Sequence, residues 1–218
     1  MYFNPLQAIG LLLLGRAAVA FPAESASPSA NILIQASNIN ITSAVFSGNG
    51  CPAGSLSTSK NSDGTGLAFG FDKMEAWIGP GYTLSEKTRN CAITLTLAVR
   101  SGYTFELVST TYHARARLPA QVKGVISSQY AFNTANTAST TQSSPAGPLQ
   151  GIYTQEEVIP KSARIASACG VEKMVLQIST RMTLTASSAS ASGGNIEGDP
   201  PLSLATQLLQ LGWSACKK

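Results

Sequence analysis

Four cysteines are the residues whose type and spacing most directly indicate chemistry: Cys51, Cys91, Cys169 and Cys216. An even number of cysteines in a secreted chain predicts disulfides, and four cysteines allow three pairings that the sequence leaves open. Our first choice joins sequence neighbours, Cys51 with Cys91 and Cys169 with Cys216, and each bond would contribute roughly 4 kcal/mol in the chain-entropy model. No thiol would then remain for nucleophilic catalysis. The sequence also offers no zinc site, because it has no Cys-x-x-Cys pair and a single histidine.

A second candidate is a row of basic side chains on one predicted strand, between residues 101 and 118. The inward apolar positions change phase near Ser109 to Thr111, as a β-bulge would produce, and this leaves His113, Arg115 and Arg117 on the outward face. Such a row could bind an anion or an acidic polysaccharide, and the imidazole would make that binding sensitive to pH. The alternative interpretation is that these charges only keep the strand soluble and prevent edge pairing.

Paired carboxylates are the third kind of chemistry that we considered. Glycoside hydrolysis requires two carboxyl groups about 5 to 9.5 Å apart. The candidates are Asp72, Glu75, Glu86, Glu106, Glu156 and Glu157. Nothing in the sequence separates such a pair from ordinary surface acids. No Gly-x-Ser-x-Gly elbow occurs, and phosphate-binding glycine loops are absent. A serine triad would have to use His113, the only histidine, which shares an outward row with two arginines. We therefore assign no catalytic residue, metal ligand or cofactor.

Two features bear on carbohydrate. Asn40 begins the acceptor triplet Asn40-Ile41-Thr42, so we predict a glycan there if Asn40 is exposed. Exposed aromatic side chains stack on sugar rings, and Trp77, Tyr82 and Tyr153 are the candidates in a carbohydrate-binding module. The alternative is that these aromatic residues belong to the core, because only 7% of the chain is aromatic.

Strand patterns must position these residues. Apolar residues alternate with small or polar ones in 67–71, 91–99 and 171–185, and Asp63-Gly64 between apolar runs predicts a hairpin. Charged residues make up 12% of the chain, against roughly 25% in an average soluble protein. The strand patterns, the low charge content and the length of 218 residues together indicate an all-β protein. We expect a single-domain antiparallel β-sandwich with two disulfides.

Two stretches lack a clear strand pattern. Residues 133–150 are polar without apolar periodicity, so we predict a loop there. Leu204, Leu208 and Leu211 fit a helical face as well as a strand, so the tail remains ambiguous.

The N-terminal residues predict export. Residues 1–20 read as a signal peptide, with an apolar core shorter than the roughly 20 residues of a spanning helix and a small-x-small site ending at Ala20. Residues 21–30 read as a disordered leader, and residues 31–218 as the β-sandwich domain. Without Arg16 the formal charge falls from +4 to +3, too weak and scattered for a nucleic-acid partner. We expect a secreted protein, extracellular or at the cell wall, with no membrane span.

The cysteine-bearing segments resemble a secreted fungal and bacterial family known as domain of unknown function 4360. The likeness is carried by Gly50-Cys51-Pro52-Ala53-Gly54-Ser55, Asp63-Gly64-Thr65, Phe71-Asp72, Gly79-Pro80-Gly81, Arg89-Asn90-Cys91, Cys169-Gly170, Trp213 and Cys216. It implies a small, signal-bearing, cysteine-bridged β protein outside the cell, and it carries over no catalytic residues.

Together these observations favour a secreted, disulfide-stabilised β-sandwich that acts by non-enzymatic binding or as a structural protein at the cell wall or extracellular surface. The expected partner is a cell-wall polysaccharide or an extracellular protein. The alternatives are a carbohydrate-binding module that uses the aromatic residues and a glycoside hydrolase that uses two of the acids.

Overall fold

Alternation of buried and outward side chains builds the strands, as β5 (Thr88–Val99) illustrates. Every second residue from Cys91 to Val99 is buried, whereas Thr94 and Thr96 face the other side. Strands of an antiparallel sheet that cover a core on one face and meet solvent on the other have this period of two.

The computed structural model describes residues 39–133, 137–187 and 201–216, which all belong to one compact unit. The first sheet contains, in spatial order, β1 (Ile39–Ser47), β5, β10 (Lys173–Ala186), β7 (Val122–Phe132) and β8 (Ala138–Ser143). The second contains β2 (Leu56–Lys60), β3 (Gly66–Phe71), β11 (Leu202–Ala215), β6 (Tyr103–Leu118) and β9 (Leu149–Val158), and β4 (Glu75–Ala76) also pairs with β11. A short helix, α1 (Leu84–Lys87), and a 3-10 turn (Lys161–Ala163) complete the described elements.

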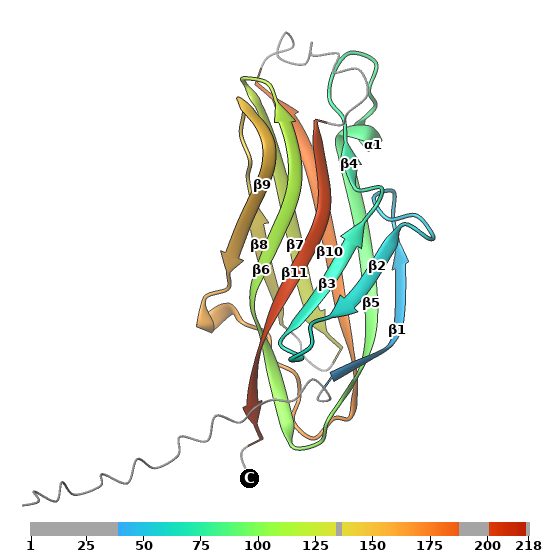
Figure 1. Cartoon of the computed structure of the whole chain (residues 1–218), viewed down its shortest axis with the longest axis vertical. Coiled ribbons are helices and arrows are strands. Elements are labelled where there is room, and N and C mark those ends of the chain that lie inside the picture. The colour runs from blue at the N-terminus through green and yellow to red at the C-terminus, as the bar shows by residue number, and fades with distance from the viewer. Residues whose placement is uncertain (1–38, 134–136, 188–200, 217–218) are drawn as a thin grey trace, which may run out of the picture. The chain divides into compact units, whose positions relative to one another are not determined.

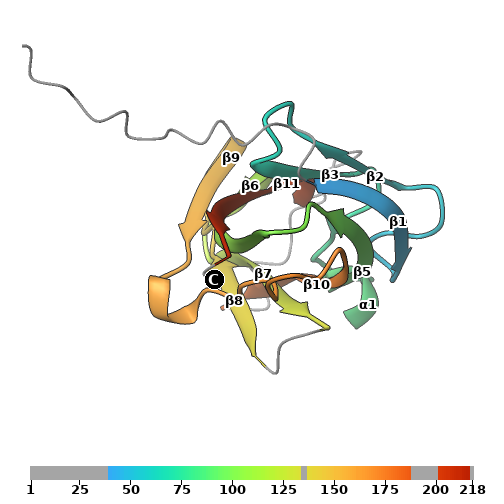
Figure 2. The ribbon, with the colours of Figure 1, turned by 90° about the horizontal axis from the view of Figure 1, so that it is seen from below.

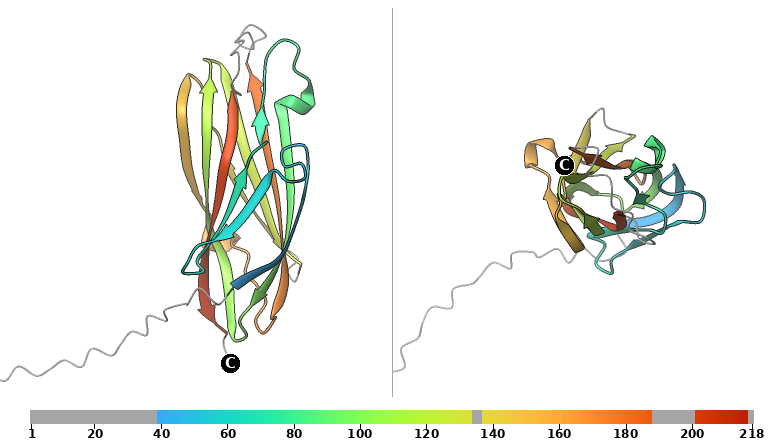
Figure 3. Two further views of the ribbon diagram at one scale, coloured as in Figure 1. Left: turned by 45° about the vertical axis from the view of Figure 1, so that its right-hand side comes forward. Right: turned by 90° about the horizontal axis from the view of Figure 1, so that it is seen from above.

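The two sheets are antiparallel and face each other across a shared core (Figure 1; Figure 2). This confirms the predicted all-β sandwich with two disulfides. The ambiguous tail is the strand β11, which lies between β3 and β6 (Figure 3). The predicted signal peptide (1–20) and leader (21–30) lie outside the described residues.

The bulge predicted in β6 is present. Ser109 and Thr110 are both buried, and the pairing of β6 with β11 shifts register between Ser109 and Leu107. Beyond this shift the buried positions are even-numbered, starting at Thr110, so the odd-numbered residues from Thr111 onward face outward.

The loop predicted for residues 133–150 is wrong in part, because it contains β8. The inward side chains of β8 are polar, and no apolar alternation revealed the strand. Each of them finds a hydrogen-bond partner instead: Ser139 bonds to the Ala163 carbonyl, Thr141 to Tyr112, and Ser143 to Tyr153. Buried hydroxyl groups are tolerated where they are bonded in this way.

A connected polar network therefore crosses the core between the sheets. The Tyr130 hydroxyl bonds to Thr110 Oγ1 at 2.8 Å, to Thr141 Oγ1 at 3.2 Å and to Gln207 Nε2 at 2.8 Å. Gln207 also accepts from Thr180 Oγ1 at 2.9 Å. The members share almost complete burial and come from five strands; they are Thr110, Tyr112, Ser128, Tyr130, Thr141, Thr180 and Gln207. Burial raises the pKa of Tyr112 well above its usual range, and the neighbouring Tyr130 adds to this.

The structure joins Cys51 to Cys91 and Cys169 to Cys216, the pairs preferred from the sequence. Cys51 and Cys91 are 0% and 1% exposed, so this bond lies in the core. Cys169 is exposed and Cys216 half-buried, so the second bond lies at the surface. In the described part of the chain, no helix is long and apolar enough to cross a membrane.

Candidate binding face

His113, Arg115 and Arg117 form a row on the outer face of the second sheet, which we call the cationic row. Their alternation on β6 directs them away from the core, because the residues between them, Ala114 and Ala116, are buried. Arg115 is exposed, and the other two are half-buried. The sequence therefore placed this row on the correct face.

The neighbours of the cationic row on the adjoining strands carry no charge. His113 is opposite Thr206 and Thr154, and Arg115 is opposite Ser203 and Ile152. Arg117 is opposite Gln150 on β9 and donates its backbone N–H to the Pro201 carbonyl at 2.8 Å.

Among the residues that the structure describes, the acids nearest to the cationic row in the strand pairing lie one further strand or residue pair away. Glu75 of β4 is opposite Ser203, and Glu156 of β9 is opposite Thr111. Opposite charges at directly paired positions would be the usual stabilising arrangement. No such opposite charge stands at the described positions paired with His113, Arg115 and Arg117.

The position of β6 weakens the interpretation that these charges only protect an edge. β6 pairs with β11 on one side and β9 on the other, so its backbone groups are already bonded (Figure 3). The edge strand is β9, whose Ile152 is 82% exposed beside Arg115.

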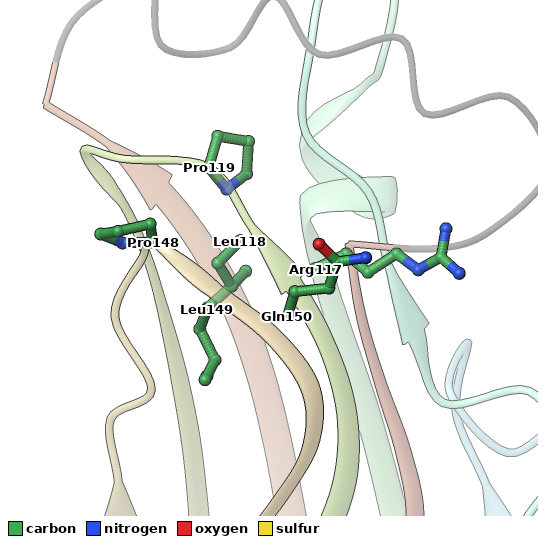
Figure 4. Close-up of a pocket in the computed structure, with 6 residues that line it drawn as sticks. All are labelled: Arg117, Leu118, Pro119, Pro148, Leu149 and Gln150. Atoms are coloured by element: carbon green, nitrogen blue, oxygen red, sulfur yellow. The ribbon is translucent and has the colours of Figure 1, made fainter.

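A hollow of about 480 Å³ lies at one end of the cationic row (Figure 4). Its lining is mostly apolar and consists of Arg117, Leu118, Pro119, Pro148, Leu149 and Gln150. A second hollow of about 220 Å³ adjoins it and is lined by Arg115, Arg117, Gln150, Gly151 and Ile152. The two share Arg117 and Gln150 as lining residues, and we call them together the depression.

Gly147 lets the two turns that border this depression meet. A Cβ atom at Gly147 would overlap the carbonyl oxygen of Pro119. The backbone N–H of Gly147 donates to the Val122 carbonyl at 2.8 Å. A larger residue would therefore push the β8–β9 turn away from the β6–β7 turn. The sequence did not reveal this hollow, because residues about thirty positions apart build it; Gly147-Pro148 was its only local signal.

The side chain of His113 is already held in place. Its Nδ1 and the Thr154 Oγ1 are 2.9 Å apart in a hydrogen bond. Arg115 forms no ion pair with any residue that the structure describes. Arg115 is therefore the member of the row most available to a ligand.

The aromatic residues do not form a stacking platform on this face. Trp77 and Tyr82 stack on each other, with ring centroids 5.5 Å apart and an interplanar angle of 24°. Tyr153 is half-buried, and its hydroxyl bonds to Ser143 Oγ at 2.7 Å across the sandwich edge.

Three of the six candidate acids have clear structural contacts. Glu106 forms an ion pair with Arg164 at 2.7 Å, and Glu156 accepts from Ser109 Oγ at 2.7 Å. Glu86 caps α1, where the backbone N–H of Thr83 lowers the pKa of the carboxyl group. Among the described residues, no three His, Cys, Asp or Glu side chains gather as a metal site would require.

Asn40, the predicted glycan acceptor, is exposed on the edge strand β1. The hydroxyl of Thr42, the third residue of its triplet, donates to the Thr96 carbonyl at 3.1 Å. Exposure is the condition that the sequence prediction set, and occupancy of the site remains a prediction.

Residues 37–216 match the model of a family described as "Domain of unknown function (DUF4360)". An uncharacterized secreted protein of Arthroderma benhamiae is 27% identical over 178 residues, which cover 82% of this chain and 72% of that protein.

Two solved structures are also similar to the chain. One is TmCBM61 in complex with beta-1,4-galactotriose, with a TM-score of 0.31 and 8% identity over 81% of this chain and 90% of that one. The other is the enzymatically active domain of bacteriophage CBA120 tailspike protein 4, with a TM-score of 0.23 and 12% identity over 81% of this chain and 20% of that one. These scores are too low to transfer a ligand or an activity.

Proposed function

The chain belongs to the DUF4360 family, and we propose that it is a secreted, non-enzymatic binding protein whose cationic row holds an acidic polysaccharide at the cell wall or extracellular surface. The relative from Arthroderma benhamiae, a secreted protein, supports the extracellular location.

The observation that carries this proposal is the absence of charged residues at the described positions paired with the cationic row, which lies on an interior strand. Three basic side chains lie at alternate positions of β6, and their paired neighbours on β9 and β11 are Thr, Ser, Ile and Gln. Guanidinium groups bind carboxylates and sulfates through paired N–H donors, and such charge-assisted bonds are roughly twice as strong as neutral ones.

The depression beside the row suits a polymer better than a small ion. Pro119, Pro148 and Leu149 offer apolar surface against the carbon face of a sugar ring, while Gln150 offers an amide. The second hollow is lined by residues of β6 and β9, among them Arg115 and Arg117. An extended acidic chain could therefore contact both arginines in succession.

The test is co-sedimentation of the secreted, oxidised protein with cross-linked polygalacturonate, chitin, β-glucan and cellulose, with sugar release measured in the same tubes. We expect retention on polygalacturonate that weakens as salt screens the exposed charges. Arg115→Ala should weaken it about tenfold, which corresponds to roughly 1.4 kcal/mol. The control is Arg181→Ala, which removes an equal charge from the outer face of the first sheet.

Equal loss in the two variants would refute a site at the cationic row, because it would report net charge alone. Failure of the wild-type protein to bind polygalacturonate at low salt would refute the acidic ligand. Release of soluble sugar would refute the non-enzymatic assignment and direct attention to Glu75, Glu156 and Glu157.

A further inference from the structure

The outer face of the first sheet carries a patch of amide and hydroxyl side chains on three neighbouring strands. β7 contributes Ser127 and Gln129, β8 contributes Thr140 and Gln142, and β10 contributes Gln177 and Ser179. All face away from the core, because the residues between them are buried. We call these six residues the amide face.

Strand pairing brings the six residues together. Gln129 is opposite Ser179 on one side and Thr140 on the other. Ser127 is opposite Gln142 and Arg181. From the ordinary spacing of strands and residues, the surface from Ala92 of β5 to β8 is about 14 Å wide, and the stretch from Gln177 to Arg181 is about 14 Å long.

The amide face is hollowed rather than filled. One hollow of about 460 Å³ lies over β7, β8 and β10, and a second of about 230 Å³ extends toward β5. Gln129 and Ser179 line both, so the two are continuous.

The amide groups of this face are available for bonding. Within the described residues, the side chains of Gln129, Gln142 and Gln177 form no hydrogen bond, and all three are exposed. The buried polar residues beneath them are satisfied by one another, as Ser128 and Thr180 are at 2.9 Å. The outer groups therefore are not needed to complete the core network.

Few charged side chains lie on the first sheet. None of the described strands of the first sheet contains Asp or Glu. Three of its four cations, Arg89, Lys123 and Lys173, lie at strand ends, so the centre of the amide face is uncharged. Arg181 lines one end of the larger hollow, and its Nε donates to Thr183 Oγ1 at 3.3 Å.

We propose that the amide face binds a neutral polysaccharide, one without carboxylate or sulfate groups. Amides and hydroxyls both donate and accept, as sugar hydroxyls do, so the two surfaces match in bonding. A protein partner would call for an aromatic or apolar centre, which Ala92 and Ala131 do not supply. A nucleic acid would call for a cluster of cations.

The experiment measures binding of the oxidised full-length protein to insoluble β-1,3-glucan, cellulose and chitin. The test variant is Gln129→Ala with Gln177→Ala, and the control is Gln155→Ala with Gln210→Ala, two exposed amides of the second sheet. We expect the wild-type protein to sediment with at least one neutral polymer, the test variant to bind it at least tenfold more weakly, and the control to be unchanged.

Two results would overturn this inference: no binding of the wild-type protein to any of the three polymers, or equal binding by the test variant. Thermal unfolding of each variant shows whether it is folded. The outcome is separable from the proposed function, because Arg115→Ala should leave neutral binding intact while the amide variant should leave polygalacturonate binding intact. Strong salt dependence of binding to the neutral polymers would also count against the amide face.

Discussion

Tyr130 and Tyr112 allow a direct test of the polar network. Removing the Tyr130 hydroxyl leaves a buried partner without a side-chain hydrogen bond, whereas removing the Tyr112 hydroxyl does not. The Tyr112 hydroxyl bonds to Thr141 Oγ1 at 2.7 Å, and Thr141 keeps Tyr130 as a second partner if Tyr112 is changed. Tyr130 bonds to three groups, and Thr110, which is 0% exposed, has no other side-chain partner in the described structure.

We therefore expect Tyr130→Phe to destabilise the protein more than Tyr112→Phe. A buried hydrogen bond contributes about 1 kcal/mol net, and an orphaned buried hydroxyl costs about 1 to 3 kcal/mol. Tyr112→Phe should cost about 1 kcal/mol, and Tyr130→Phe about 3 kcal/mol. For a chain of this length these values correspond to falls in Tm of roughly 2 to 4 °C and 6 to 12 °C.

Urea unfolding followed by circular dichroism gives both free energies of unfolding, provided that the slope with denaturant is unchanged. Adding Thr110→Val to Tyr130→Phe removes the orphaned hydroxyl and should recover part of the loss, although Thr110→Val alone destabilises. Additive effects of these two changes would refute the reasoning, as would equal costs for the two tyrosine variants.

Two further predictions concern pH and redox conditions. Because burial raises the pKa of Tyr112, the unfolded chain loses the phenol proton before the folded chain does, as the pH passes about 10. The stability that the buried neutral phenol contributes is therefore complete below that pH and is lost above it. Phenolate absorbance at 295 nm from Tyr112 should appear only with unfolding, and Tyr112→Phe should remove that component. The Cys169–Cys216 disulfide lies at the surface, so it should be reduced and alkylated in the folded protein before Cys51–Cys91; labelling of Cys51 first, found by peptide mass, would contradict this. Replacing Cys169 and Cys216 by alanines should lower the free energy of unfolding by about 4 kcal/mol.

Side-chain alternation was enough to predict the strands around Cys91 and Met174 and the outward face of His113, because apolar residues there mark the core directly. It failed at β8, whose inward Ser139, Thr141 and Ser143 look like solvent-facing residues until Tyr112 and Tyr153 are placed opposite them. A polar interior has no apolar period, so its strands read as loops.

The candidate sites differ in the same way. The cationic row lies on one strand and is visible in the sequence. The depression beside it and the amide face are built from turns and strands far apart in the chain, so only the strand order brings their residues together.

The surface disulfide has a mechanical consequence for β11. β11 lies inside the second sheet and ends beside Cys216, so tension on that end would peel β11 from β3 and β6 one residue pair at a time. The bond to Cys169 diverts the load to the segment just before β10, in the opposite sheet. The disulfide thus protects the pairing of β11 from force applied at that end. In single-molecule pulling, the reduced protein should release β11 at a lower force than the oxidised one.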